Sequence, residues 1–261
     1  MPFLNLQDVS VSFGGLEAVR ALNLCIEQGE LVGLIGPNGA GKTTVFNLLT
    51  GVYTPTHGKI TLRCGEKGVE LGGMRPDAIC SAGVARTFQN IRLFKDLSVL
   101  DNVRIAMHQN AKCSLFDSML HTKKNRREEE RIMEESLTIL SVFHLDKKKD
   151  ELARNLPYGE QRHLEIARAL ATKPKLLLLD EPAAGMNPNE TAELCTLISS
   201  LRERFKLTIL LIEHDMSLVM RLCERICVLN YGAQIACGCP VEIRSNAEVI
   251  RAYLGGEVAH A

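Results

Sequence analysis

The fold of this chain is decided by the stretch Gly36-Pro37-Asn38-Gly39-Ala40-Gly41-Lys42-Thr43-Thr44. It matches the phosphate-binding loop pattern G-x-x-x-x-G-K-[ST]. The apolar run at 31–35 before it has the length of a buried strand. After it, apolar residues from 45 to 52 recur at the three- and four-residue spacing of an amphipathic helix. Because a strand, a glycine-rich turn and a helix are the context that this loop requires, we predict that residues 36–44 bind a nucleoside triphosphate.

The residue types of the loop each have a physical role. Glycines let successive backbone N–H groups turn inward toward phosphate oxygens, and the N-terminus of the following helix adds partial positive charge. Lys42 would reach the β- and γ-phosphates, and the hydroxyl of Thr43 would bind Mg²⁺. The sequence therefore predicts a metal ligand at Thr43.

Composition limits the class of protein. The chain has 261 residues, of which 46% are hydrophobic and 24% charged, which is enough for a full core. Its 31 basic residues balance 31 acidic ones, which argues against a nucleic-acid partner. Nine cysteines lie scattered along the chain, as expected in a reducing compartment rather than in a disulfide scaffold. We expect most of them to be small buried hydrophobes rather than zinc ligands.

The sequence shows neither a signal peptide nor a membrane-spanning segment. The first thirteen residues contain no basic stretch followed by an apolar core, and nowhere do about 18 apolar residues follow one another. We therefore expect a cytosolic protein, which could still dock onto a membrane protein.

The hydrophobic pattern predicts an α/β fold with an inserted helical segment. Alternating apolar residues in the first 30 positions, extended by residues 58–74, predict an antiparallel β layer. From about residue 85 to 156 the pattern is helical, and the charged run Lys123–Glu135 is expected to form the solvated face of a helix whose other face carries Met133, Leu137, Leu140 and His144. Continuous apolar runs at 176–179 and 208–212 predict parallel strands covered on both faces. We expect a nucleotide-binding core of residues 1–85 and 157–261, with a helical subdomain at 86–156.

A second phosphate-site element follows the apolar run at 176–179. Asp180 at the end of this strand would lie beside the Mg²⁺, and Glu181 would polarise a water in line with the γ-phosphate. Acidic residues after a strand are also common helix caps. Together with the loop at 36–44, the metal and catalytic roles are the better interpretation.

The stretch 156–170, Leu-Pro-Tyr-Gly-Glu-Gln-Arg-His-Leu-Glu-Ile-Ala-Arg-Ala-Leu, places a turn at the start of a helix just ahead of that strand. This resembles the ABC transporter ATPases, whose LSGGQ signature corresponds to Leu156–Glu160. In that family the turn caps the γ-phosphate bound by the other subunit of a head-to-tail dimer. This chain departs from the signature, because Pro157 replaces Ser and Tyr158 replaces the first Gly. The resemblance leaves Gly159 and the amides of Tyr158, Glu160 and Gln161 to face phosphate.

The same resemblance assigns three further positions. Phe13 would stack on adenine, although it could instead be a core residue. Gln89 would link Mg²⁺ and the attacking water to the helical subdomain, and His214 would contact the γ-phosphate. The loop 185–188 corresponds to a dimer contact. The family pattern implies a P-loop ABC ATPase fold, with ATP and Mg²⁺ as cofactors.

A narrower resemblance rests on residues 83–94, 184–188 and 251–255. These segments look like the longer ATPase subunit of importers for branched-chain amino acids, and importers of urea and short-chain amides share most of them. The resemblance implies ATP hydrolysis coupled to transport at the cytoplasmic face of the inner membrane. The implied partners are a second ATPase subunit, identical or homologous, integral-membrane permease subunits and, indirectly, a solute-binding protein.

Two rival functions belong to other classes. A soluble ABC ATPase acting on DNA or ribosomes usually carries two such domains or a long coiled-coil insertion, and neither is evident here. A switch protein or kinase built on the same loop would lack the turn at 156–161. Co-purification with membrane subunits would separate these alternatives.

Overall fold

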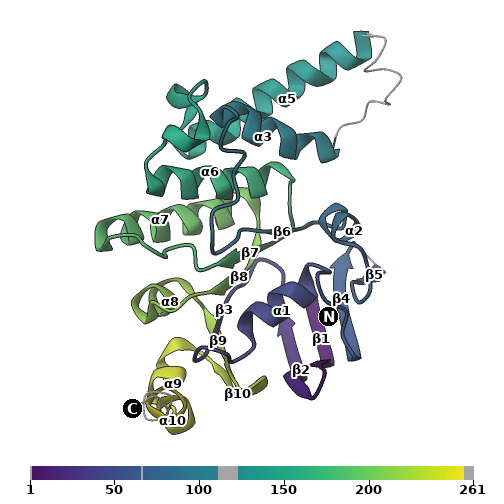
Figure 1. The fold of residues 1–261 in the computed structure, drawn as a ribbon, viewed down its shortest axis with the longest axis vertical. Helices are drawn as coiled ribbons and strands as arrows, with labels where there is room; N and C mark the ends of the chain where they lie inside the picture. Colours follow the sequence, from purple (N-terminus) through teal and green to yellow (C-terminus); the bar gives the residue numbers. More distant parts are fainter. Residues whose placement is uncertain (1, 66, 111–122, 256–261) are drawn as a thin grey trace. The chain divides into compact units, whose positions relative to one another are not determined.

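The computed structural model describes residues 2–65, 67–110 and 123–255. The chain divides into two compact units, of which the first comprises Met1–Arg86 with Lys175–Ala261 and the second comprises Thr87–Pro174 (Figure 1). We expected the second boundary at 156/157. It falls later because α6 (Tyr158–Ala171) packs against α3 (Val99–Met107) and α5 (Lys123–Val142).

The first unit is built around a six-stranded sheet with the order β10-β9-β3-β8-β7-β6. Every residue of its central strands is buried, which explains their continuous apolar sequences. All neighbouring strands are parallel except β9 and β10. The strands are β3 (Leu31–Ile35), β6 (Val84–Arg86), β7 (Leu176–Asp180), β8 (Thr208–Ile212), β9 (Arg225–Asn230) and β10 (Ala233–Gly238).

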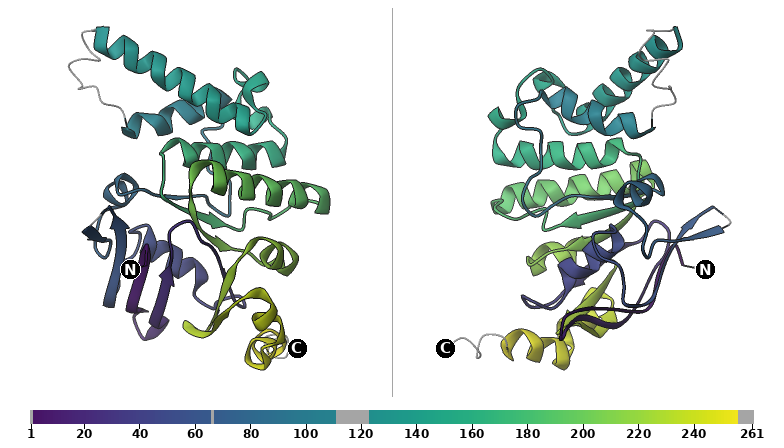
Figure 2. Two further views of the ribbon diagram at one scale, coloured as in Figure 1. Left: turned by 180° about the vertical axis from the view of Figure 1, so that it is seen from behind. Right: turned by 45° about the vertical axis from the view of Figure 1, so that its right-hand side comes forward.

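A four-stranded antiparallel sheet with the order β2-β1-β4-β5 forms the second layer of this unit. Its strands are β1 (Leu4–Phe13), β2 (Leu16–Ile26), β4 (His57–Cys64) and β5 (Lys67–Glu70). The main core cluster joins both sheets and α1 (Lys42–Leu49) through Leu6, Leu22, Phe46 and Leu178. Both views in Figure 2 show α1 alongside the strands of this layer. The predicted fold class and the antiparallel layer are confirmed.

Three strands of the first unit differ from the sequence prediction. We expected helical structure from residue 85, but Val84–Arg86 forms β6 at the edge of the central sheet, held by parallel pairing with β7. Strands β9 and β10 were not predicted, although β9 carries a short continuous apolar run at 226–229. The residues of β10 are mixed in polarity and only partly buried, so its local pattern is weak. The helices of this unit other than α1 are α2 (Pro76–Ser81), α7 (Pro188–Phe205), α8 (Met216–Leu222), α9 (Pro240–Ser245) and α10 (Ala247–Gly255).

Among the described residues, one pair of cysteines is joined. Cys227 and Cys237 face each other across β9 and β10 and form a disulfide. This differs from the expectation of nine separate cysteines, because residues 10 positions apart in sequence become direct neighbours in an antiparallel pair. Cys195 and Cys223 are free and buried, as expected for small hydrophobic residues, while Cys25 and Cys239 are free and exposed.

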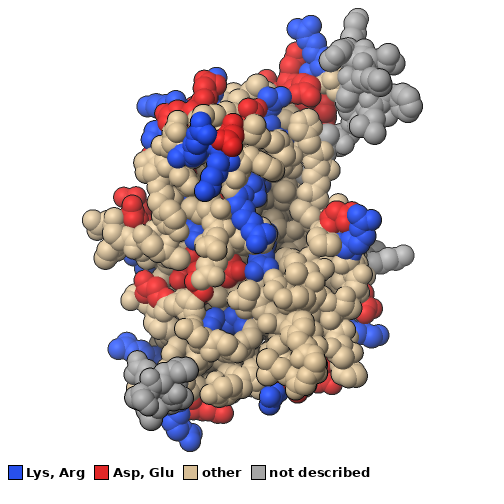
Figure 3. Space-filling model, in the orientation of Figure 1, with Lys and Arg blue, Asp and Glu red and all other residues tan. Residues whose placement is uncertain are grey.

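The second unit is helical. Besides α3, α5 and α6 it contains short 3₁₀ turns at η1 (His108–Asn110), η2 (Asp146–Lys148) and η3 (Ala153–Asn155). The charged run lies on α5 as predicted, with an exposed Arg126–Glu130 pair, and Figure 3 shows charges of both signs over these helices. The predicted apolar face is shifted. Ile132, Ser136, Ile139 and Leu140 are buried, whereas His144 is exposed beyond the end of the helix.

Across the part of the chain that the structure describes, none of the helices combines the length and the apolar character that a bilayer crossing requires.

Candidate nucleotide-binding site

The phosphate loop connects the end of β3 to the start of α1, as its pattern predicts. At two positions of the loop only glycine fits, because the backbone φ is positive and an added Cβ would clash with a neighbouring carbonyl oxygen. Gly36 has a φ of +152°, and a Cβ there would lie 2.1 Å from the carbonyl oxygen of Leu229. At Gly41, with a φ of +100°, a Cβ would lie 2.6 Å from the carbonyl oxygen of Ala18. The loop is therefore pressed against β9 and β2, and only glycine fits at these contacts.

Lys42 lies inside the loop. It is 7% exposed, and its ammonium donates hydrogen bonds to the carbonyl oxygens of Gly36 at 2.6 Å and Pro37 at 2.9 Å. Burial lowers the pKa of Lys42, while the carboxylates of Glu181 and Asp180 oppose that shift. The charge is thus held where the loop turns, between two carbonyls and two acidic groups. Thr43, the next residue, is exposed at the start of α1.

Asp180 ends β7 as predicted, and it is buried in an ion pair. Its Oδ2 accepts a hydrogen bond from Nη2 of Arg86 at 2.7 Å, and both side chains are less than one-tenth exposed. The other terminal nitrogen of Arg86 donates to Oδ1 of Asn47 at 2.7 Å, and the guanidinium lies over the ring of Phe46. Arg86 therefore ties β6, β7 and α1 together beneath the phosphate loop. Arg86 was not predicted, because its strand is only three residues long and its partner Asp180 is distant in sequence.

Glu181 and His214 meet directly. Nε2 of His214 and Oε1 of Glu181 form a short hydrogen bond, and the Glu181 backbone N–H donates to the carbonyl of Ile212 at 2.9 Å. Glu181 has a φ of +47°, an uncommon conformation for a residue with a side chain and one that is concentrated at functional sites. The carboxylate is mostly buried, while the imidazole is about half exposed. His214 therefore faces solvent, while Glu181 is held in place beneath it.

A residue that sequence analysis missed holds this pair in place. Glu213 is 4% exposed, and its carboxylate accepts hydrogen bonds from the backbone N–H of Ala183 at 2.8 Å and of His214 at 3.1 Å. Burial raises the pKa of Glu213, whereas these N–H groups and that of Asp215 oppose the rise. The side chain therefore joins the turn that follows Glu181 to the turn that carries His214.

Phe13 lies at the end of β1 and is 43% exposed, so its ring is not a core residue. It makes an edge-to-face contact with Tyr53, with the ring centroids 4.8 Å apart. The exposure leaves an aromatic surface available for stacking. Tyr53 was not predicted, because no local pattern links it to β1.

Gln89 belongs to the second unit, where α6 holds the segment that carries it. Arg162 is 1% exposed and donates to the carbonyls of Phe88, at 2.6 Å, and Gln89. Glu165, one turn along α6, pairs with Arg162 at 3.0 Å and accepts from the backbone N–H of Arg92 at 3.1 Å. Gln89 itself is exposed. This clamp of Arg162 and Glu165 on the Gln89 segment was not predicted, because the partners are distant in sequence.

The turn at 157–161 opens α6 as expected, with Pro157 at the N-cap and Tyr158 46% exposed. One detail differs from the prediction. The backbone N–H of Gln161 donates to the carbonyl of Pro157 at 3.0 Å, because the fourth residue of a helix already has a partner within it. Gly159 lies in the first turn of the helix, and the carboxylate of Glu160 pairs with Lys148 at 2.6 Å.

The family profile described as ABC transporter matches residues 19–184 of this sequence, a range that includes the phosphate loop, the turn at 157–161 and Glu181. The chain belongs to the ABC transporter ATPase family. The profile described as branched-chain amino acid ATP-binding cassette transporter matches residues 233–259 of this ABC ATPase.

Relatives of this ABC ATPase match it over almost its full length. It is 50% identical over 254 residues to the high-affinity branched-chain amino acid transport ATP-binding protein LivG of Salmonella typhimurium, covering 97% of this chain and 98% of LivG. It is 46% identical to BraF of Pseudomonas aeruginosa, with the same coverage. The crystal structure of the ADP conformation of MJ1267, an ATP-binding cassette of an ABC transporter, superposes with a TM-score of 0.83 at 28% identity, covering 98% and 99% of the two chains.

The predicted site residues of this ABC ATPase divide between its two units. The phosphate loop, Asp180, Glu181, His214 and Phe13 lie in the first unit, and there the structure joins Glu181 to His214. Gln89 and the turn at 158–161 lie in the second unit. The residues that sequence analysis missed are those that hold the others in place: Arg86, Glu213, Arg162, Glu165 and Tyr53.

Proposed function

We propose that this ABC ATPase hydrolyses ATP to power the import of branched-chain amino acids across the membrane. The substrate class is supported by the match of residues 233–259 to the branched-chain amino acid cassette profile. The 50% identity to LivG over 97% of this chain supports it as well. The import direction and the amino-acid cargo both follow from these relatives. The chain itself would bind nucleotide and not the amino acid.

The chemistry of the first unit fits phosphoryl transfer to water. Lys42 and the inward N–H groups of the loop would bind the β- and γ-phosphates of ATP. The Glu181 carboxylate would orient the attacking water and accept its proton at Oε1 or Oε2. His214, in contact with that carboxylate through Nε2, would hold the γ-phosphate on the other side. Phe13 would stack on the adenine ring.

Mg²⁺ is part of this proposal, and the donor set fits it. Among the described residues, no group of three or more His, Cys, Asp and Glu side chains could hold a metal ion. Mg²⁺ takes few protein ligands and completes its shell with water and phosphate oxygens, so a hydroxyl and a carboxylate suffice. The Thr43 hydroxyl and Asp180 would supply these in the first unit. When bound, the ion would neutralise charge on the transferring phosphoryl group.

The second unit would serve a neighbouring subunit. The first turn of α6, with the amides of Tyr158, Gly159 and Glu160, forms a helix N-terminus that favours an anion. We infer that it caps the γ-phosphate held by a second ATPase subunit, identical or homologous, in a head-to-tail dimer. ATP would join the two subunits and hydrolysis would release them, a switch in which the γ-phosphate biases two states.

The membrane partners belong to the same proposal. The dimer would act on integral-membrane permease subunits from the cytoplasmic face of the inner membrane, as a peripheral protein with no stretch that crosses the bilayer among its described residues. A solute-binding protein would deliver the amino acid on the opposite side.

Uptake in whole cells tests the function. Cells that lack this chain should lose energised uptake of labelled leucine, and the unaltered chain should restore it while Glu181→Gln should not. Urea uptake in the same cells is the comparison. Loss of urea uptake with leucine uptake unchanged would replace the amino-acid proposal with a urea or amide importer, and unchanged uptake of both would contradict import.

A further inference from the structure

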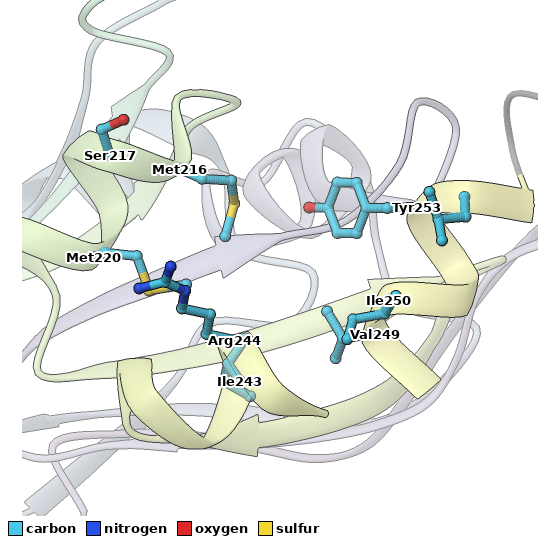
Figure 4. A pocket seen from close by; sticks show the side chains of 9 residues that line it. Met216, Ser217, Met220, Ile243, Arg244, Val249, Ile250 and Tyr253 are labelled. Carbon is cyan, nitrogen blue, oxygen red and sulfur yellow. The ribbon is translucent and has the colours of Figure 1, made fainter. Parts of the chain in front are cut away.

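A cavity lies among the last helices of the first unit. It has a volume of about 530 Å³, within the range of small-molecule sites, and opens between α8, α9 and α10 (Figure 4). Its wall is mainly aliphatic. The apolar side chains that line it are Met216, Met220, Ile243, Val249, Ile250 and Leu254.

Among the described residues that line this cavity, Arg244 is the one charged residue, and none is Asp or Glu. Arg244 is exposed on the last turn of α9. Among the residues that the structure describes, it takes part in no ion pair. Figure 4 shows its side chain reaching from α9 toward Met220 on α8. A guanidinium beside an aliphatic wall matches a carboxylate attached to an aliphatic chain, and its planar fork can bind both carboxylate oxygens.

The cavity lies next to two segments that carry nucleotide-site residues. Met216 begins α8 two residues after His214, and Asp215 caps that helix through the N–H groups of Ser217 and Leu218. On the opposite wall the backbone N–H of Gly36 faces the Tyr253 hydroxyl, whose pKa is raised by burial. Met216 and Tyr253 point toward one another across the cavity in Figure 4. A molecule bound between them would therefore touch neighbours of both the phosphate loop and the His214 turn.

We propose that this cavity binds an aliphatic monocarboxylate without an amino group, a fatty acid of medium length being the best match. Arg244 would pair with the carboxylate, and the aliphatic chain would lie against the two methionines and the isoleucines. An amino acid fits less well, because its ammonium would find no acidic side chain among the described residues of the lining. This inference concerns a ligand other than nucleotide and does not depend on the transported substrate.

The methionine methyl groups provide a direct probe. The chain has eight methionines and no tryptophan, so ¹³C-methyl NMR of the full chain without nucleotide gives few, separable signals. We expect titration with octanoate to shift the Met216 and Met220 methyls in a saturable way. Affinity should rise about fourfold for each added methylene from hexanoate to decanoate, because each buries further apolar surface.

Arg244→Gln tests the carboxylate contact, and Arg251→Gln is its matched control. Arg251 is an exposed arginine of α10 that donates to the carbonyl of Ala247 and does not line the cavity. We expect Arg244→Gln to weaken octanoate at least about tenfold, the size of a charge-assisted hydrogen bond, with Arg251→Gln unchanged. Unshifted signals from the other methionines show that each variant is folded.

Four results would overturn this proposal. The first is the absence of saturable shifts at Met216 and Met220, and the second is octanol or octylamine binding as tightly as octanoate. The third is unchanged octanoate binding in Arg244→Gln, and the fourth is leucine binding more tightly than octanoate, which would point to an amino-acid site. Because no nucleotide is present, failure here leaves the ATPase proposal untouched.

Discussion

At the scale of single residues, the catalytic geometry depends on buried groups that hold exposed ones. Glu181 is held by its own backbone bond to Ile212 and by its contact with His214. Glu213 fixes the backbone on both sides of that contact. Arg86 and Asp180 form a buried ion pair. The exposed groups are therefore positioned by ionic side chains that are themselves almost fully buried.

Glu181→Gln should slow ATP hydrolysis by on the order of a hundredfold or more, since the amide cannot accept a proton from water. Nucleotide binding should persist because Lys42 and the loop are unchanged. Phosphate release and nucleotide binding measured on the same preparation check this. Glu203→Gln, an exposed glutamate on α7, is the control that should leave both unaltered. Unchanged turnover in Glu181→Gln would remove the catalytic assignment.

Glu213→Gln should lower kcat with little change in the KM for ATP. The glutamine amide keeps one acceptor oxygen, but its NH₂ group would face one of the two backbone N–H groups that Glu213 bonds. One hydrogen bond between the turns that carry Glu181 and His214 would therefore be lost. Turnover is expected to fall about tenfold, the cost of one poorly satisfied buried N–H group. A change in KM alone, with kcat preserved, would show that Glu213 does not position the pair.

Glu213 also makes a prediction about pH. Its pKa is raised by burial in the folded chain, so the folded state binds this proton more tightly than the unfolded state does. Its stabilising contribution is present at pH values below the ordinary carboxyl pKa and is lost as pH rises through the raised value. The unfolding free energy of the unaltered chain minus that of Glu213→Gln should therefore fall as pH rises from about 4 toward neutrality, given the ordinary glutamate pKa near 4.3. A difference that rises over this range would contradict the assigned direction.

At the scale of secondary-structure elements, local patterns were predictable and pairings distant in sequence were not. The strand, loop and helix at 31–49 and the strand ending in Asp180 follow from runs of residues that are contiguous in sequence. Strand β6 is three residues long and is held by β7, so no local pattern could indicate it. The clamp of Arg162 on the Gln89 segment joins residues 73 positions apart, and Arg86 reaches Asp180 across 94. Such partners become neighbours only in the folded chain.

Gly36→Ala should abolish ATP binding and destabilise the fold, because the added methyl would meet the carbonyl oxygen of Leu229. Gly39→Ala is the matched control within the same loop. Its Cβ would meet nothing within 4 Å, so only its positive φ makes it unfavourable, at about 1 kcal/mol. Nucleotide binding and denaturant unfolding measured for both variants check this. Equal effects would show that the contact with β9 does not shape the loop.

Arg162→Ala should destabilise the second unit by about 3–5 kcal/mol, the cost of leaving the buried Glu165 carboxylate without its partner. Arg162→Met combined with Glu165→Gln should recover a large part of this loss, because it removes both charges. Arg126→Ala, which breaks an exposed pair on α5, should change stability by less than about 0.5 kcal/mol. Denaturant unfolding of the three variants compares them. A loss for Arg162→Ala no larger than for Arg126→Ala would contradict the clamp.

At the scale of the whole molecule, the sequence motifs and the full-length relatives agree on one class of protein. The chain is electrically neutral, matches an ABC ATPase cassette structure over 98% of its length, and divides its site residues between two units. The phosphate loop with its catalytic pair and the capping turn of α6 belong to different units. This division fits a subunit that gives half of its chemistry to a neighbour, as we propose.

Calorimetric titration of the purified full chain with magnesium-complexed ATP tests the central claim most directly. The account predicts saturable heat for the unaltered chain and its loss in Lys42→Ala, because the ammonium inside the loop would no longer meet the phosphates. No heat with the unaltered chain, or equal heat with Lys42→Ala, would contradict it.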